Sequence, residues 1–285
     1  MATLSGCNLD TSTSDKDPEL QALLAKMTVE QKVGQMTQLN LGFLSTSTEQ
    51  HDGKPKEVDW AKVKEAVQKY HVGSILNSNG YAKPLEEWHE IINVIQRLAA
   101  DTDHGIPVLY GIDAIHGATY IENAVLFPHN IAMAATRDRS LVRGGAEATA
   151  SLTRASGIRW NFDPVFDVGR EPLWPSFEET FGESALLCGE MGSQVVKGYQ
   201  GDDLQASGVA SCLKHFIGYS VPESGKDRTE AYISGLEMWE QHIPSFQAGV
   251  DTGASTVMLI SVSVNGVPIH ASRQHVTELL RHQMG

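Results

Sequence analysis

The feature that most constrains the fold of this chain is a regular alternation of short apolar runs with longer amphipathic stretches. The short runs, which we predict to be strands, are Val72–Leu76, Pro107–Gly111, Ile158–Phe162, Ala210–Phe216 and Thr256–Val262. The amphipathic stretches, which we predict to be helices, are Trp60–Tyr70, Leu85–Ala99, Leu141–Ser156, Ala185–Gln200 and Glu237–Thr252. Strands that alternate with helices in this way form a parallel sheet covered by helices, so the chain predicts an α/β fold.

Two α/β architectures suit this alternation: an open doubly wound sheet and a closed eight-stranded barrel. No predicted strand is followed by the G-x-G-x-x-G loop of dinucleotide-binding sheets, which disfavours the first. In barrels, binding residues gather at the carboxyl ends of the strands. Polar residues occupy that position here, with Asp113 after one predicted strand, Asp163 and Asp167 after the next, and Lys214-His215 inside another. The pattern favours a (β/α)8 TIM-barrel-like domain.

The domain organisation predicted from the sequence is simple. Residues 1–17 form a polar N-terminal tether, and residues 18–285 form one barrel domain, a length compatible with the roughly 250 residues of many α/β barrels. Asp17-Pro18-Glu19-Leu20 predicts a first helix start, and Thr28–Gln31 a second with a capping box. The stretch Val33–Gln38 that follows is interpreted as the first strand or its approach.

The N-terminal tetrapeptide Leu4-Ser5-Gly6-Cys7 is similar to a bacterial lipobox, in which the cysteine carries a lipid anchor. Two interpretations stay open: a chance match in a loose terminus, or a periplasmic or secreted parent protein that is lipid-anchored. No apolar run is long enough to predict a membrane-spanning helix.

Composition limits the partners. The net charge is −13, with 22 basic and 35 acidic residues, and such a surface repels nucleic acid and anionic lipid. The three cysteines are too few for a disulfide framework, and we predict that Cys188 and Cys212 are small core residues rather than metal ligands. Neutral ligands remain open.

Two segments combine side chains that a binding site for a hydroxylated ligand needs. Asp113, in the Gly111–Gly117 segment, can accept hydrogen bonds from two adjacent hydroxyl groups. The segment Asp163–Trp174 combines carboxylates with the cation of Arg170 and with an indole, Trp174, that we expect to be exposed.

Two further segments are polar. Lys214-His215 places two adjacent donors in an apolar strand, where a lysine is costly to bury unless it is paired. Gly225–Thr229 is predicted to be a polar loop with an ion pair within it.

Taken in order, these segments resemble the N-terminal domain of family 3 glycoside hydrolases, a family of β-glucosidases and exo-β-glucanases. The resemblance extends from about Leu20 to Gly285. The strings that carry it are Val33–Gln38, Gly111–Gly117, Leu126–Asn130, Ala134–Thr136, Phe177–Glu183, Lys214–Tyr219 and Val264–Pro268.

The resemblance implies a pocket for the terminal, non-reducing sugar of a β-glucoside or β-glucan oligosaccharide. By motif position, Asp113 binds sugar hydroxyls, Lys214 and His215 donate to others, and Arg170 and Trp174 contribute further contacts. The implied reaction is retaining hydrolysis, which needs a carboxylate nucleophile about 5–5.5 Å from a carboxylic acid and no metal or organic cofactor.

The chain departs from the family pattern in several places. We expect the nucleophile and the acid/base residue to lie beyond Gly285, so the barrel is incomplete and this chain alone is predicted to be inactive. Ser176 follows Trp174-Pro175 where the family carries an arginine, and a lost charge-assisted hydrogen bond costs about 1.5–3 kcal/mol. Ser184 replaces an aspartate, and Leu259–Val264 is more apolar than the family pattern.

Two hypotheses about function therefore stay open. One is a β-glucosidase-type hydrolase domain; the other is a catalytically inactive barrel that serves as a carbohydrate-binding or interaction scaffold. A barrel without its last strands exposes two sheet edges, which predicts self-association or binding of a complementing fragment.

Overall fold

The structure, a computed structural model, describes residues 17–46 and 57–285. The proposed lipobox and all of the proposed tether except Asp17 lie outside the described residues. The helices are α1 (Pro18–Lys26), α2 (Val29–Gln35), α3 (Trp60–Lys64), α4 (Leu85–Ala100), α5 (Asn130–Ala135), α6 (Arg139–Ala155), α7 (Ala185–Gln200), α8 (Gly235–Glu237) and α9 (Ile243–Asp251). Tighter or wider helical turns are η2 (Glu65–Lys69), η3 (Phe177–Glu179), η4 (Met238–His242), η5 (Ile269–Ala271) and η6 (Gln274–Gln283).

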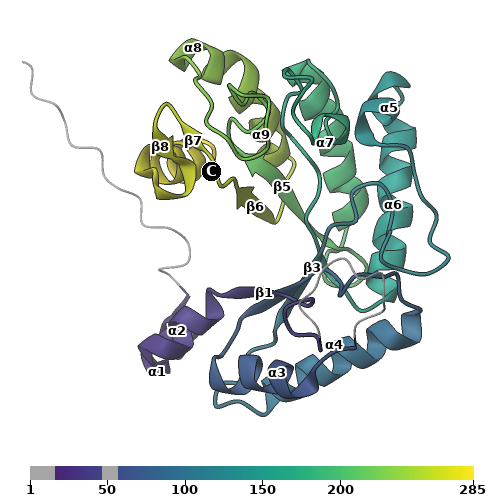
Figure 1. The fold of residues 1–285 in the computed structure, drawn as a ribbon, viewed down its shortest axis with the longest axis vertical. Helices are drawn as coiled ribbons and strands as arrows, with labels where there is room; N and C mark the ends of the chain where they lie inside the picture. The colour runs from purple at the N-terminus through teal and green to yellow at the C-terminus, as the bar shows by residue number, and fades with distance from the viewer. Residues whose placement is uncertain (1–16, 47–56) are drawn as a thin grey trace, which may run out of the picture.

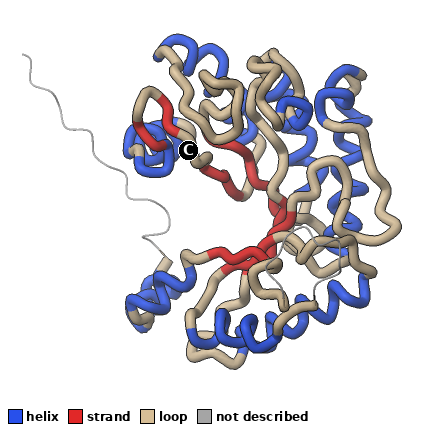
Figure 2. The backbone as a smooth tube through the Cα atoms, in the orientation of Figure 1, coloured by secondary structure: helices blue, strands red, loops and turns tan. Residues whose placement is uncertain are grey.

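Six strands form one parallel sheet in chain order: β1 (Gln38–Asn40), β2 (Ser74–Leu76), β3 (Leu109–Ile112), β4 (Trp160–Asn161), β5 (Ala210–Phe216) and β6 (Thr256–Leu259). A separate antiparallel hairpin is made by β7 (Ser263–Val264) and β8 (Val267–Pro268). The six strands curve into an arc with helices along its outer side (Figure 1; Figure 2). The chain is therefore an incomplete, barrel-like α/β fold, as the sequence predicts.

The sheet is open at both ends of the arc. Within the described residues, β1 pairs only with β2, and β6 pairs only with β5. Each outer strand keeps one row of backbone N–H and C=O groups without a neighbouring strand. Figure 2 shows these two strands at the two ends of the arc.

The N-terminal helices begin where their capping residues predict. The Asp17 carboxylate accepts hydrogen bonds from the backbone N–H groups of Glu19 and Leu20. Thr28 and Gln31 form a reciprocal capping box, with bonds of 3.2 and 2.9 Å. Of the two interpretations of Val33–Gln38, the approach to the first strand is the one that the structure shows, because the helix that this box starts continues to Gln35 and β1 begins only at Gln38.

Most other elements lie close to their predicted ranges. The predicted helix Glu237–Thr252 instead divides into α8, η4 and α9, which together span Gly235–Asp251. None of the helices in residues 17–46 and 57–285 combines the length and hydropathy that crossing a bilayer requires.

Buried apolar side chains lie in three clusters. One packs α4, through Trp88, against β1 to β3. A second joins β5, β6, α9 and η6 and includes Phe216 and Phe246, whose rings pack edge to face at 5.3 Å. The third lies between α5, α6 and α7 and includes Cys188. Cys188 and Cys212 are buried free thiols, as predicted for core residues. This packing on the outer side of the sheet fixes the strands whose carboxyl ends carry the polar residues.

Candidate functional site

A buried lysine and a half-exposed aspartate form the centre of the candidate site. Asp113 directly follows β3, and Lys214 lies near the end of β5. The Lys214 Nζ donates to Asp113 Oδ1 at 2.8 Å, with 4% of the lysine side chain and 29% of the aspartate side chain exposed. The sequence predicts that a buried Lys214 needs a partner. That partner is Asp113, another predicted site residue, which follows a strand two positions away in the sheet.

The loop after β2 fixes the orientation of Asp113. Asn77 Nδ2 donates to Asp113 Oδ2 at 2.9 Å, and Asn77 Oδ1 accepts from the Asp113 backbone N–H at 3.0 Å. Asn77 is not among the residues that the sequence reasoning singles out, although it follows β2 at the strand end where Asp113 follows β3. The same positional rule, applied to every strand end, would have found it.

The next strand end is held in the same way. Asn161, the last residue of β4, accepts from the Ala114 backbone N–H at 2.8 Å and donates to the Ala114 carbonyl at 3.0 Å. These bonds tie the loop that carries Asp113 to the neighbouring strand, so the site rests on two rigid strand ends.

His215 is held by a buried carboxylate. Asp167 Oδ2 accepts from the His215 backbone N–H at 2.7 Å and from His215 Nδ1 at 2.8 Å. Only 1% of the Asp167 side chain is exposed, against 13% of the His215 side chain. Because a carboxylate only accepts, Nδ1 carries the proton, and Nε2 is the ring nitrogen left for a ligand.

The backbone that carries Asp167 extends the sheet beyond β4. Val165 pairs with Lys214 in a parallel bridge, and the Phe166 N–H donates to the Lys214 carbonyl at 2.6 Å. The Lys214 N–H in turn donates to the Pro164 carbonyl at 3.1 Å. This pairing brings the carboxylates of Asp163 and Asp167 beside β5.

The carboxylates around Lys214 control its charge. Burial by itself would lower the pKa of Lys214, but the charges of Asp113 and Asp163 outweigh it and raise that pKa above its ordinary value. Burial raises the pKa of Glu179, and the charges of Lys214 and His215 act to lower it. Glu179, from η3, is therefore a further carboxyl of this cluster that the sequence reasoning does not single out, although it lies in one of the motif strings.

The structure does not bring Arg170 into this cluster. The Arg170 side chain is exposed, and its Nη1 donates to Gln241 Oε1 at 3.2 Å in η4. No hydrogen bond or ion pair joins it to Asp113 or Lys214 within the described residues. Its role as a sugar contact stays a prediction.

Trp174 is buried, contrary to the expectation from the sequence. The sequence suggests an exposed indole, but only 1% of this residue is exposed. The ring packs edge to face on Tyr219 at 4.8 Å, and Tyr219 packs edge to face on His215 at 4.9 Å. Trp174 therefore packs in the core behind Tyr219, and its role as a sugar contact stays a prediction. Ser176, two residues on, lies half-buried before η3.

The polar loop after β5 closes against the same aromatic pair. The predicted ion pair within this loop is present and joins Asp227 Oδ2 to Arg228 Nε at 3.5 Å, with both side chains largely exposed. The Tyr219 hydroxyl donates to Asp227. The loop is thus anchored on the ring that packs against His215.

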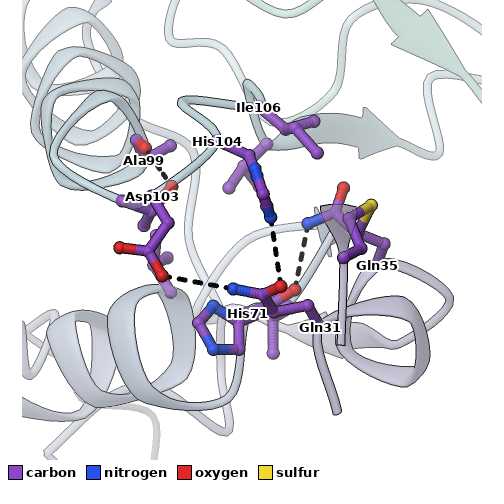
Figure 3. Close-up of a pocket in the computed structure, with 12 residues that line it drawn as sticks. Gln31, Gln35, His71, Ala99, Asp103, His104 and Ile106 are labelled. Carbon is purple, nitrogen blue, oxygen red and sulfur yellow. Dashed lines mark hydrogen bonds between the residues drawn. The ribbon is translucent and has the colours of Figure 1, made fainter. Parts of the chain in front are cut away.

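A second polar cluster lies at the amino ends of β2 and β3 and is drawn in Figure 3. The Gln31 side chain donates to Asp103 Oδ2 at 3.3 Å and accepts from His104 Nε2 at 3.1 Å, while Gln35 donates to the His71 carbonyl at 3.1 Å (Figure 3). The cavity beside them has a volume of about 20 Å³, room for roughly one water molecule. Polar residues at this end of a barrel act in stability rather than in catalysis.

The Asp113–Lys214 cluster suits a neutral ligand rich in hydroxyl groups. Lys214 has three N–H donors and gives one to Asp113, whose oxygens keep lone pairs beyond the two hydrogen bonds that they accept. A donor and an acceptor 2.8 Å apart can each bond to one of two neighbouring hydroxyls. Asp163 and Asp167, with 0% and 1% exposed, are too deeply buried to touch such a ligand.

Comparison with known proteins gives the family of this chain. Residues 28–285 match the description "Glycosyl hydrolase family 3 N terminal domain". The lysosomal beta glucosidase of Dictyostelium discoideum is 37% identical over 287 residues, which cover 95% of this chain and 34% of that protein. The periplasmic beta-glucosidase of Salmonella typhimurium is 27% identical over 271 residues, 95% of this chain and 32% of that protein.

Solved structures give the same relationship in three dimensions. The exo-1,3/1,4-beta-glucanase of a Pseudoalteromonas species superposes with a TM-score of 0.82 at 31% identity, over 94% of this chain and 34% of that one. The chain spans about a third of the length of these relatives. Since the family match extends over residues 28–285, the chain belongs to glycoside hydrolase family 3, within its N-terminal domain.

Proposed function

We propose that Asp113, Lys214 and His215 bind the terminal, non-reducing β-D-glucosyl residue of a β-glucoside or β-glucan, as the sugar-binding part of a β-glucosidase-type hydrolase. The observation that carries this proposal is the 2.8 Å pair of Lys214 Nζ and Asp113 Oδ1 at the carboxyl edge of the sheet. Solved relatives include a β-glucosidase from Listeria innocua in complex with glucose and a mutant of it in complex with laminaribiose. Sugars of this kind are the ligands that we assign to the cluster.

The reaction that we propose for the whole enzyme is retaining hydrolysis. It requires two carboxyl groups about 5–5.5 Å apart, one as nucleophile and one as acid/base. Asp163 and Asp167 do not supply them, because each is buried and each holds another side chain. We expect both catalytic groups outside residues 1–285, and no hydrolysis of an aryl β-glucoside by this chain alone. Turnover clearly above that of an Asp113→Ala variant would show that expectation to be wrong.

Binding of D-glucose to the purified chain, followed by NMR titration, tests the sugar site. Asp113→Asn removes a charged acceptor, and the loss of one charge-assisted hydrogen bond of about 1.5–3 kcal/mol corresponds to roughly a tenfold or greater loss of affinity. Glu190→Ala is the matched control, since it removes a carboxylate from an exposed ion pair with Arg139 outside the site. Equal affinities of the Asp113→Asn variant and the wild type, or no binding by the wild type, would contradict the proposal.

The second candidate is a catalytically inactive barrel that binds sugar or a protein partner. The observation that favours it is Ser176, which stands where the family resemblance implies an arginine that holds the sugar. Ser176→Arg tests the point, because a restored planar cation should strengthen glucose binding by roughly tenfold or more. An unchanged affinity would remove Ser176 as an argument for a degenerate site.

For localisation we propose the periplasm or the cell exterior, with Cys7 as the lipid attachment point of the parent protein. Relatives of the chain include a periplasmic and a lysosomal β-glucosidase. Mass spectrometry of Cys7 after expression with a lipoprotein leader tests the anchor, and an unmodified cysteine would contradict it.

A further inference from the structure

The proposed sugar site does not use Asp163, which is the most deeply buried carboxyl near it. Asp163 follows β4, and none of its side chain is exposed. Its Oδ2 accepts a hydrogen bond of 2.7 Å from the Tyr199 hydroxyl of α7. Within the described residues, Oδ1 has no hydrogen-bond partner. A buried carboxylate with one bonded oxygen is far from satisfied, so its charge depends on the cations around it.

Among the described residues, Lys214 is the cation whose charge acts on Asp163. The backbone N–H groups of Cys212 and Lys214 donate to the carbonyls of Asp163 and Pro164, at 3.0 and 3.1 Å. Asp163 therefore flanks the strand segment that carries the lysine, while the lysine Nζ bonds to Asp113. Asp113, Asp163 and Glu179 all act on this single ammonium group.

We propose that Asp163 is a positioning residue, which draws the Lys214 ammonium group away from Asp113 when its own carboxyl is ionised. In the neutral state of Asp163, the ammonium stays on Asp113, where a sugar hydroxyl can reach both groups. In the ionised state, two carboxylates compete for the ammonium, and the donor for the sugar is pulled toward the core. The consequence for sugar binding rests on the proposed function; the effect on the lysine does not.

The competition between Asp113 and Asp163 for the Lys214 ammonium group changes in the neutral pH range. Burial raises the pKa of Asp163 from 3.8 to about 7, against the lowering effects of Lys214 and of the Tyr199 hydroxyl. Asp163 is therefore largely protonated at pH 5 and largely ionised at pH 9. The titratable groups that face it are Tyr199 from α7, Lys214 and Cys212 from β5, Asp113 after β3, Glu179 from η3, and His116, which lines a cavity of about 20 Å³ with Asp163 and Tyr199.

The first experiment needs no sugar. The ¹⁵Nζ and ¹³Cε NMR signals of Lys214, assigned by their loss in Lys214→Met, are followed from pH 5 to pH 9 in the wild type and in Asp163→Asn. We expect a transition near pH 7 in the wild type that is absent from Asp163→Asn. Tyr199→Phe removes a hydrogen bond that favours the ionised form, so its transition should shift to higher pH. If Asp163→Asn does not fold, Asp163→Ser and Tyr199→Phe provide the comparison.

The second experiment measures the dissociation constant of D-glucose over the same pH range. We expect affinity to fall by about fivefold between pH 6 and pH 8 in the wild type and to stay level in Asp163→Asn. By reciprocity, bound glucose then lowers the acid dissociation constant of Asp163 by about the same factor, which raises its pKa. Contributions from His215 and Glu179 are common to both proteins, so the difference between the two profiles isolates Asp163.

The outcomes separate the two proposals. A Lys214 transition that persists unchanged in Asp163→Asn, or that is absent from the wild type, overturns the positioning role. A Lys214 transition that depends on Asp163, in a chain that binds no glucose at any pH, supports the positioning role and overturns the proposed sugar site. Glucose affinity with the same pH profile in both proteins overturns the link between Asp163 and sugar binding.

Discussion

Replacement of Asp167 by alanine should destabilise the protein more than any surface change. This carboxylate is buried and accepts two hydrogen bonds through one oxygen, from the His215 backbone N–H at 2.7 Å and from His215 Nδ1 at 2.8 Å. Asp167→Ala leaves both donors without a partner in a region where Asp167 is 1% exposed. Each buried donor left unpaired costs about 1–3 kcal/mol, so the free energy of unfolding should fall by about 2–6 kcal/mol.

Asp167→Asn is the sharper of the two variants. Both hydrogen bonds converge on Oδ2, so an amide oxygen at that place still accepts from the His215 backbone N–H and from Nδ1, but without a charge. Neutral hydrogen bonds contribute about 0.5–1.5 kcal/mol and those to a charged group about 1.5–3 kcal/mol, so Asp167→Asn should lose less stability than Asp167→Ala. His215 should keep its proton on Nδ1, because the amide oxygen still accepts from it.

Urea denaturation gives the change in unfolding free energy, and ¹⁵N NMR of the imidazole gives the tautomer. Glu190→Ala is the control, since its ion pair with Arg139 is exposed on both sides and such pairs contribute about 0–1 kcal/mol. Unfolding of Asp167→Ala at the same urea concentration as Glu190→Ala would contradict the predicted loss of stability. A proton on Nε2 instead of Nδ1 of His215 in Asp167→Asn would contradict the assigned hydrogen bond.

Three further predictions concern packing, pH and association. A Cβ atom on Gly111 would lie 2.2 Å from Phe162 Cζ, so Gly111→Ala should lower the free energy of unfolding by about 1–3 kcal/mol through overpacking. Gly144 lies in an exposed turn of α6 with nothing within 4 Å of an added Cβ, so Gly144→Ala should raise the free energy of unfolding by about 0.5–1 kcal/mol. Thermal unfolding that shifts in the same direction in both variants would contradict this. The folded-state pKa of Asp163 is raised from 3.8 to about 7, so its contribution to stability is complete below pH 3.8 and is lost as the pH rises through 7. In urea unfolding, the wild type should therefore lose stability relative to Asp163→Asn from pH 5 to pH 8. Parallel pH profiles of the two proteins would refute this. The unpaired edges of β1 and β6 predict that the purified chain self-associates or binds a complementing fragment, and sedimentation velocity showing one stable monomer at all concentrations would count against that.

Much of the candidate site could be predicted because barrels concentrate chemistry at one sheet edge. Asp113 and Lys214 are predicted from their position at strand ends and from the family resemblance, and the structure places them in contact. Their role in sugar binding stays a prediction. Asn77 obeys the same positional rule but escapes the sequence reasoning, because its strand ends in an Asn-Ser-Asn string with no charged residue.

Other residues could not be placed from sequence at all. Trp174 and Asp163 lie in one polar segment that looks solvent-exposed when read as a string, yet the structure buries both. Asp163 is covered because this segment pairs with β5, where the Phe166 N–H donates to the Lys214 carbonyl, and Trp174 is covered by Tyr219. No local window of sequence contains that pairing.

Three features of this protein can be predicted from local sequence: the strand and helix alternation, the caps at Asp17 and Thr28, and the strand ends that carry polar residues. These follow from contacts within a few residues, since caps and periodicity are local. The choice of carboxylate that pairs with each cation depends on how the chain packs in three dimensions. Asp113 and Lys214 are 101 residues apart, and their energies depend on water removed by helices and loops from elsewhere in the chain, which is a property of the packed molecule.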